Sequence, residues 1–425
     1  MELFRDKFFK RLTVNMGNPI YKNSIIIIST SIVSAVFGFV FWVLAAKIYS
    51  EKEIGIATAL ISSVSLLILF SRFGFDQSLI RFFPKGNKDK IYTSSVVVTT
   101  FLTILVGIFF IIFINKLYSN ITIEHNDKII FIIILVASSI ASINSNSFIA
   151  LREAKYYFIS NILLGSRIIF LNSFIFFGAW GIFNSFGLSF ILAFIFSSIA
   201  IYVLGIRASR LDKQFLSQSF KFSAGNYLAT LLNSTPTLIL PIMVLKMLGP
   251  EAAAYYYIPF SIASILFYIP FAFSTSLFVE GSHGESLIRT TLESICGVFL
   301  LLIPSVGIIY IWGAFILNTI GPSYINGLEL LMILSFSSFF VAVYQTFLSI
   351  KKIQNDIKSL VLISTIICVL IIGLSYILMK DLGLIGIGIS WIASYAVASV
   401  ISLIMIFKAN GTALIDWLRK LSDII

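Results

Sequence analysis

Long apolar runs alternate with short polar connections along nearly the whole chain, and this pattern predicts membrane-spanning helices. A spanning helix needs about 20 mostly apolar residues. Twelve runs meet that length, at residues 24–46, 54–74, 91–114, 129–150, 157–177, 186–206, 223–247, 252–275, 287–311, 326–350, 358–379 and 384–407. We therefore predict an all-α integral membrane protein with twelve transmembrane helices.

The two ends of the chain mix apolar with basic residues. In residues 1–23, Phe8 and Phe9 stand beside Lys7 and Lys10, so charges interrupt the apolar stretch that a signal peptide would need. We predict that this segment lies at the membrane surface as an amphipathic helix. The C-terminal tail, residues 408–425, has the same character and receives the same prediction.

The two halves of the chain match each other under a single shift, the one that brings Lys47 onto Lys246. The same shift brings residues 148–152 onto 347–351 and Ser160 onto Ser359. Because one shift aligns positions along the whole chain, we interpret the halves as a duplication. The predicted order is an N-terminal segment (1–23), a first lobe (24–206), a basic cytoplasmic linker (207–221), a second lobe (222–407) and a C-terminal tail (408–425).

Composition agrees with this interpretation. The chain is 58% hydrophobic and 12% charged with a mean hydropathy of +1.00, which excludes an ordinary soluble domain. Cys296 and Cys368 both fall in apolar runs, so we interpret them as small packing residues, not as a disulfide or metal pair. The sequence predicts no cofactor and no metal.

The basic residues indicate the orientation. Of the 30 Lys and Arg residues, 23 fall in the termini and in every second connection, 6 fall in the other connections, and Arg167 lies within a run. The positive-inside rule then places both termini in the cytoplasm. An even number of helices in each half makes the halves parallel repeats. The net charge of +11 reflects this topology, so we predict no nucleic-acid partner.

Arg167 is the clearest candidate for a binding role. It lies about ten residues into the run 157–177, which is roughly 15 Å along a helix and close to the membrane midplane. A buried cation in a membrane needs a partner, and an anionic substrate would supply one. The alternative is that Arg167 bonds within the bundle, through Asn161, Asn172 or backbone carbonyls.

Four further cations are candidates for the same anionic substrate. Arg72 and Arg81 flank the cytoplasmic end of the second run, in SRFGFDQSLIRFFPK, and Lys47 and Lys246 close equivalent runs at the other face. All four are also explained as ordinary anchors at the membrane boundary.

The remaining candidates concern movement and coupling. Pro236 and Pro241 lie in one run and each removes a backbone hydrogen bond, so this helix is a candidate hinge, with a static kink as the alternative. Glu293 is a carboxylate inside a run and a candidate for ion coupling, with an ion pair to Arg289 as the alternative.

Several segments resemble a known family. KIYSEKEIGIATAL (47–60), DLGLIGIGISWIAS (381–394) and the regions 245–285 and 321–356 are similar to the polysaccharide-biosynthesis branch, which includes O-antigen flippases, of the multidrug/oligosaccharidyl-lipid/polysaccharide (MOP) superfamily. The first segment departs from the family pattern at Ser50-Glu51-Lys52, where Gly-Pro-Glu is typical.

The resemblance implies a MATE-like bundle of two parallel six-helix repeats. It also implies a flippase that moves a polyprenyl-diphosphate-linked oligosaccharide from the inner to the outer leaflet by alternating access. The cations that line the cavity in this family would hold the diphosphate, and Arg167 and Arg72 are the matching candidates. The polar side chains of Asn144, Asn146 and Tyr344-Gln345 are candidates to face the sugars. Membrane lipids, a polysaccharide polymerase or glycosyltransferases would be the partners.

Three other functions stay open. A drug or cation antiporter of the same superfamily would need carboxylates in the membrane core of the first lobe, where Asp76 and Asp127 lie only at the ends of runs. An enzyme of the same pathway would need a nucleophile or a metal-binding cluster on a sizeable loop, and the sequence has neither, so we predict that the protein is not an enzyme. A scaffold without transport activity in a glycan-assembly complex is the third.

Overall fold

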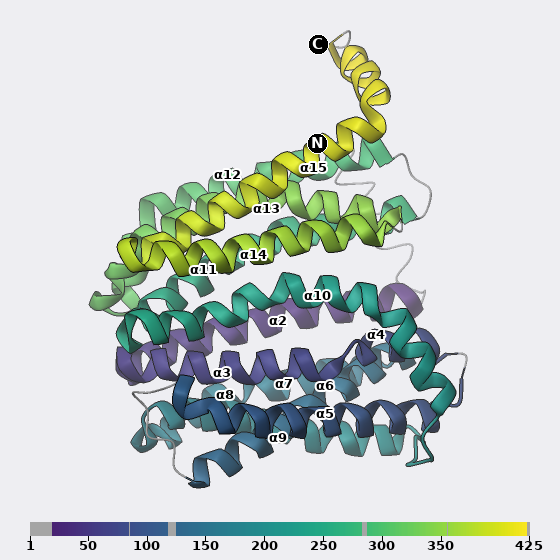
Figure 1. Ribbon diagram of the computed structural model, residues 1–425, viewed down its shortest axis with the longest axis vertical. Helices are drawn as coiled ribbons and strands as arrows, with labels where there is room; N and C mark the ends of the chain where they lie inside the picture. The colour runs from purple at the N-terminus through teal and green to yellow at the C-terminus, as the bar shows by residue number, and fades with distance from the viewer. Residues whose placement is uncertain (1–18, 85, 118–124, 283–286, 355, 423–425) are drawn as a thin grey trace. The chain divides into compact units, whose positions relative to one another are not determined.

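The computed structural model describes residues 19–84, 86–117, 125–282, 287–354 and 356–422. Within these ranges all regular secondary structure is helical and no strand occurs, which confirms the predicted all-α class (Figure 1). Of the predicted surface segment 1–23, residues 1–18 lie outside the described residues, and residues 19–23 begin a long helix that continues to Ile48.

The first half of the chain forms long helices and several short ones. They are α2 (Pro19–Ile48), α3 (Glu51–Arg72), α4 (Phe75–Phe82), α5 (Lys88–Leu117), α6 (His125–Leu151), α7 (Ala154–Gly165), α8 (Arg167–Ser173), the 3-10 helix η1 (Ile175–Phe177) and α9 (Ala179–Val203). The second half contains α10 (Lys213–Leu248), α11 (Pro250–Ser282), α12 (Leu287–Ile320), the 3-10 helix η2 (Pro322–Gly327), α13 (Leu328–Ile353), α14 (Ile357–Leu382) and α15 (Leu384–Ser422).

Eleven of the helices in the described ranges are long and apolar enough to cross a membrane. They account for all but one of the twelve predicted spans. The exception is the run 157–177, for which we predicted one continuous helix, and this prediction is wrong. The structure divides the run into α7, α8 and η1, with breaks at Ser166 and Phe174.

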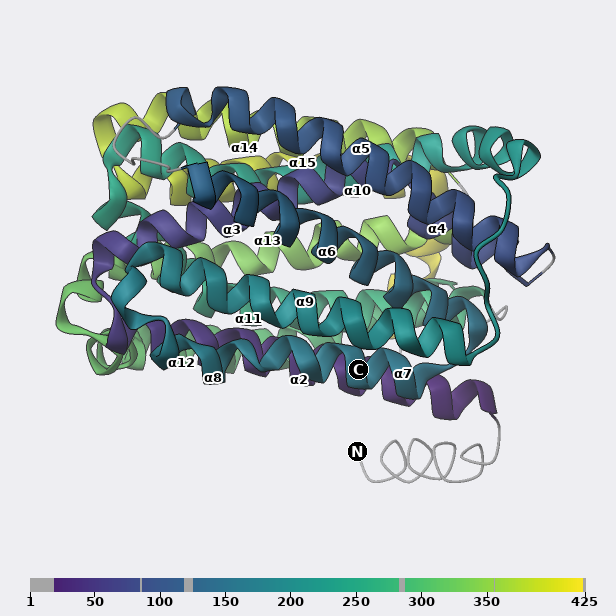
Figure 2. The same ribbon diagram turned by 90° about the horizontal axis from the view of Figure 1, so that it is seen from below.

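The chain separates into two compact units. The first unit comprises Met1–Ile48 and Val64–Tyr227, and the second comprises Tyr49–Ser63 and Leu228–Ile425. In the first unit α6 packs against α5 and α9, and α2 packs against α7 and α8 (Figure 2). In the second unit α13 packs against α11 and α15, and α15 also packs against α14. The lobe boundaries drawn from the sequence repeat stay a prediction.

A short helix, α4, is held in the core of the first unit. Phe75, Leu79 and Phe83 on and beside it are almost fully buried and pack in one cluster with Phe148 of α6 and Phe215 of α10. Burial of such apolar side chains stabilises the fold by about 1.5–3 kcal/mol each. The cluster therefore fixes α4 and the turn that precedes it.

The segment that precedes α10 is tied to α5. The backbone N–H groups of Arg207, Ser209 and Asp212 donate to side-chain oxygens in the first turns of α5, on Asp89, Thr93 and Ser94, over 2.8–3.0 Å. These bonds satisfy backbone donors that lie outside a helix. Residues 207–212 of the predicted linker therefore form an extended strap, and its remaining residues begin α10.

Candidate functional site

Arg167 begins α8 directly after the break in the predicted span. The backbone N–H of Ser166 donates to the carbonyl of Leu163 at 3.1 Å, which closes a 3-10 turn in place of an α-turn. The Ser166 hydroxyl donates to the same carbonyl at 2.6 Å. Gly165 lies so close to Phe37 that a Cβ there would be 2.3 Å from its ring. The break therefore lets α7 approach α2 closely and sets the direction of Arg167.

The Arg167 guanidinium lies among aromatic rings from two other helices. Its central carbon is 5.0 Å from the ring centroid of Phe41 on α2 and 5.9 Å from that of Phe186 on α9. Its Nη2 would be 3.3 Å from a Cβ at Gly38, so this glycine leaves room for the guanidinium. Ring faces attract cations. The structure therefore places a cation at the junction of α2, α8 and α9.

Asn161 and Asn172 are the two side chains named above as alternative partners of Arg167. The Asn161 side-chain amide donates to the carbonyl of Tyr157 in its own helix at 2.8 Å. Asn172 is exposed on α8. A substrate-binding role for Arg167 stays a prediction.

Arg72 is the last residue of α3, and its side chain is 29% exposed. Its Nη1 lies 3.8 Å from Oδ2 of Asp76 in the first turn of α4. Charge-assisted hydrogen bonds between such groups measure about 2.7–2.9 Å, so this pair attracts without a hydrogen bond. The Nε atom of Arg72 is buried and has no acceptor among the residues that the structure describes.

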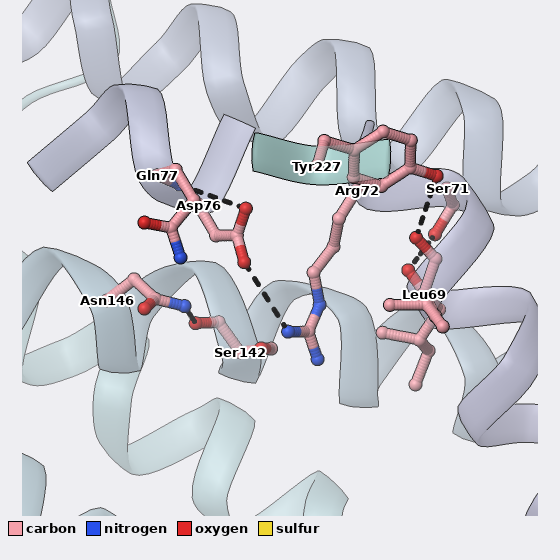
Figure 3. Close-up of polar contacts among 9 residues, drawn as sticks. Leu69, Ser71, Arg72, Asp76, Gln77, Ser142, Asn146 and Tyr227 are labelled. Carbon is pink, nitrogen blue, oxygen red and sulfur yellow. Dashed lines mark hydrogen bonds and ion pairs between the residues drawn. The ribbon is translucent and has the colours of Figure 1, made fainter. Parts of the chain in front are cut away.

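The turn between α3 and α4 brings these two charges together. Phe73 has a φ of 46° and Gly74 a φ of 79°, so two successive residues adopt the left-handed conformation. A residue with a Cβ pays about 1–2 kcal/mol for that conformation. Figure 3 shows Arg72 extended toward Asp76, on the side of α6 where Ser142 and Asn146 lie.

Tyr227 of α10 fixes the end of α3. Its hydroxyl lies 3.1 Å from the carbonyl oxygens of both Leu69 and Phe70, to which it can donate (Figure 3). These carbonyls belong to the last turn of α3, where a helix leaves its acceptors unfilled. The Tyr227 ring stacks on Phe73 at 5.4 Å. The sequence analysis missed this residue, because a single tyrosine early in an apolar run carries no pattern of its own.

The other predicted cations lie at helix ends. Arg81 is exposed in the last turn of α4, with its guanidinium carbon 5.8 Å from the ring of Phe82. Lys47 and Lys246 are exposed in the last turns of α2 and α10. These positions suit anchors at a membrane boundary, and a role in substrate binding stays a prediction for each.

Two of the residues that we expected to face sugars are buried, and that prediction is wrong for them. Asn144 is fully buried: it accepts from the Tyr92 hydroxyl at 2.8 Å and donates to Ser197 at 2.9 Å. Tyr344 is 1% exposed and donates to Asn233 within the second unit. Their hydrogen bonds join helices together. Asn146, by contrast, is partly exposed on α6 near Arg72, as Figure 3 shows.

The hinge and coupling candidates lie on two helices of the second half. Pro236 and Pro241 are buried inside α10, which continues as a helix through both. Glu293 is exposed close to the start of α12, and the Arg289 side chain lies outside the part of the chain that the structure describes. Hinge motion and ion coupling stay predictions. Among the described residues no three His, Cys, Asp or Glu side chains group closely enough to hold a metal ion.

Comparison with known proteins supports the membrane-transport fold. The model of a family described as "Polysaccharide biosynthesis protein" matches residues 20–278. A search of curated proteins finds no match. Among solved structures, an inward closed conformation of the lipid II flippase MurJ is similar, with a TM-score of 0.73 at 15% identity over 90% of this chain and 87% of that one.

Multidrug transporters share the fold as well. An inward-facing MATE family transporter of the MOP superfamily has a TM-score of 0.70 at 15% identity over 90% of this chain and 96% of that one. An outward-facing one has a TM-score of 0.65 at 13% identity over 95% and 98%. These structures share the fold predicted from the sequence, with twelve transmembrane segments in two parallel repeats of six helices.

Proposed function

The chain belongs to the polysaccharide biosynthesis protein family, and we propose that it is a flippase for a polyprenyl-diphosphate-linked oligosaccharide. It would move this lipid from the inner to the outer leaflet of the cell membrane by alternating access, without a chemical step. A polysaccharide polymerase or glycosyltransferases would be its partners. The lipid II flippase among the structures with this fold acts on a substrate of similar chemical class, which supports the proposal.

The observation that carries the proposal is the Arg72 guanidinium. It lies at the end of a spanning helix, 3.8 Å from one carboxylate, and its buried Nε atom has no hydrogen-bond partner in the described part of the chain. A guanidinium has five N–H donors that match the geometry of phosphate oxygens. Arg167 is a second cation within the same unit. We infer that these two arginines bind the diphosphate at different stages of transport.

The acidic residues favour this function over cation antiport. An antiporter that exchanges a cationic drug for a proton needs a carboxylate in the membrane core. In the described part of the first unit, Asp76, Asp89 and Asp127 each lie in the first turn of their helix, and Glu153 and Asp212 lie in the residues directly before α7 and α10. The described carboxylates of this unit therefore lie at or before the starts of helices, and the arginines at the end of α3 and the start of α8 suit an anionic substrate.

The first test is transport in proteoliposomes that contain a fluorescent polyprenyl-diphosphate oligosaccharide. We expect the wild type to move the lipid across the bilayer, and Arg72→Ala and Arg167→Ala each to slow it by about tenfold or more, as loss of about 1.4 kcal/mol of binding would do. Arg210→Ala is the matched control, because Arg210 is exposed before α10.

Thermal unfolding of each variant checks that it folds. A folded wild type that moves no lipid, with or without a proton or sodium gradient, would contradict the proposed function. Transport at the wild-type rate by both arginine variants would leave the function standing and would remove the two residues from the pathway.

A further inference from the structure

Arg72 and Asp76 form an ion pair in which neither side chain makes a hydrogen bond to the other. Asp76 Oδ1 accepts from the backbone N–H of Gln77 at 2.9 Å, and Oδ2 lies 3.8 Å from the guanidinium. A carboxylate accepts bidentate bonds from arginine when the geometry allows it. Here the hydrogen bond from the Gln77 backbone keeps the Asp76 carboxylate out of the bidentate geometry. The carboxylate lowers the electrostatic cost of burying the Arg72 cation, but it makes no hydrogen bond to the guanidinium donors.

Both side chains of the ion pair remain partly exposed. Asp76 is 18% exposed and Arg72 is 29% exposed, so both side chains can be reached from outside the protein. On the side of α6 next to the guanidinium, the Asn146 side-chain amide donates to the Ser142 carbonyl at 2.9 Å, and this polar group lies near the pair in Figure 3. An anion that contacts the guanidinium at hydrogen-bond distance would gain bonds that Asp76 does not make.

We propose that Asp76 is a placeholder counter-ion: it neutralises Arg72 while the site is empty and is displaced by the anionic group of the transported lipid. The inference rests on the proposed function. Anionic headgroups are abundant in the inner leaflet, and a bare arginine at its boundary would attract them. A tethered carboxylate keeps the guanidinium available to a diphosphate, which has more charge and more acceptor oxygens than a single phosphodiester.

Tyr227 positions the guanidinium in this arrangement. Its hydroxyl caps the last turn of α3, one turn before Arg72 ends the helix, and its ring packs on Phe73 in the left-handed turn. Loss of the hydroxyl leaves every charge in place but loosens the residue that carries the guanidinium. The two side chains therefore act in opposite senses: Asp76 competes with the ligand, and Tyr227 prepares the site for it.

The test is binding of inorganic pyrophosphate to the purified full-length protein, measured by calorimetry in detergent without divalent cations. Removal of a competing negative charge about 4 Å from the guanidinium favours a bound anion, so Asp76→Asn is expected to tighten binding by about tenfold or more. Tyr227→Phe is expected to weaken it. Glu153→Gln removes the same charge beside Lys155 instead and should leave binding unchanged.

A double variant separates competition from a general change of charge. If Asp76 acts through Arg72, then Arg72→Ala weakens binding by about tenfold or more, and Asp76→Asn has no further effect in its presence. Asp76→Ser serves as a second neutral variant if Asp76→Asn fails to fold. Unchanged or weaker binding by a folded Asp76 variant would overturn the proposal, as would the absence of pyrophosphate binding in every variant. Normal binding without lipid transport would instead count against the proposed function alone.

Discussion

At the scale of single residues, the turn between α13 and α14 shows how buried charge is compensated. Lys351 is 8% exposed, and its Nζ lies 3.1 Å from Oδ2 of Asp356 and donates to Gln354 at 3.1 Å. Asp356 caps α14 by accepting from the Ser359 hydroxyl at 2.6 Å and from its backbone N–H at 3.2 Å. The Ser359 bonds, and then Lys351, lower the pKa of Asp356 from 3.8 to about 2.

This lowered pKa predicts an acid-sensitive contribution to stability. A carboxylate whose pKa is lower in the folded state stabilises that state above its unfolded pKa, and the contribution is lost as pH falls through the folded value. For Asp356 the window lies between about pH 4 and pH 2. We expect Asp356→Asn to lower the melting temperature at pH 7, and the difference from wild type to vanish toward pH 2. A constant difference over this range would contradict the assignment.

The same turn shows what a sequence repeat can and cannot predict about residues. The repeat places Arg152 on Lys351. Arg152 is exposed with a φ of 61°, whereas Lys351 is helical and paired with Asp356. Equivalent basic residues therefore have different environments in the two halves. The difference arises because Lys351 has Asp356 as its partner and because the helix ends at a different position in each half. The pairing of Arg72 with Asp76 also depends on the structure, because the turn at Phe73 and Gly74 puts the two residues in different helices.

At the scale of elements, α3 approaches α11 with no space for a side chain. A Cβ at Gly55 would lie 1.8 Å from the carbonyl oxygen of Pro250 and 3.1 Å from the Cβ of Ala253, all within the second unit. The neighbour is backbone, which cannot rotate away as a flexible side chain does. The glycine therefore sets the distance between the two helices.

We expect Gly55→Ala to destabilise the protein by about 1–3 kcal/mol or more, the usual cost of overpacking a core. Gly307→Ala in α12 is the matched control, because a Cβ there meets nothing within 4 Å. It should be neutral or stabilising by up to about 1 kcal/mol, through helix propensity. Thermal unfolding in detergent measures both. Equal melting temperatures for the two variants would show that α3 and α11 can separate without cost.

The helices were predicted correctly where the apolar pattern alone determines their length. The break in one helix was not predicted from that pattern. Eleven predicted spans correspond to long helices, since lipid requires a helix to satisfy its own backbone. The break at Ser166 was missed because residues 157–177 remain apolar on both sides of it. Beside the break, a Cβ at Gly165 would lie 2.3 Å from the ring of Phe37, a residue far away in the sequence, and no pattern along the chain indicates this contact.

At the scale of the whole molecule, the composition and the repeat were sufficient to predict the fold class, and the site was not predictable to the same degree. A hydrophobic content of 58% leaves few folds other than a membrane bundle. Charge alone marked Arg72 and Arg167, but it also marked Lys47, Lys246 and Arg81, which lie exposed at helix ends. Arg72 also ends a helix, so the two groups differ in the burial of the side chain and in the contacts around each cation, which depend on how the helices pack.

The orientation in the membrane is the remaining property of the whole molecule that the charges predict. With 23 basic residues in one set of connections and 6 in the other, both termini should lie in the cytoplasm. A reporter active only in the cytoplasm, fused after residue 425 or within the linker near residue 210, should be active. The same reporter inserted at residue 120 or near residue 322 should be silent.

Charge reversal provides the control for this topology. Arg210→Glu combined with Arg207→Glu reverses two of the 23 positive charges on the cytoplasmic side, so the orientation should persist. Adding a block of lysines near residue 322 places many positive charges on the opposite side, and it should disturb the membrane insertion of the second half. Activity of the reporter on both sides of one helix would show that this helix does not span the membrane, and it would contradict the parallel arrangement of the repeats, which needs an even number of spans in each half.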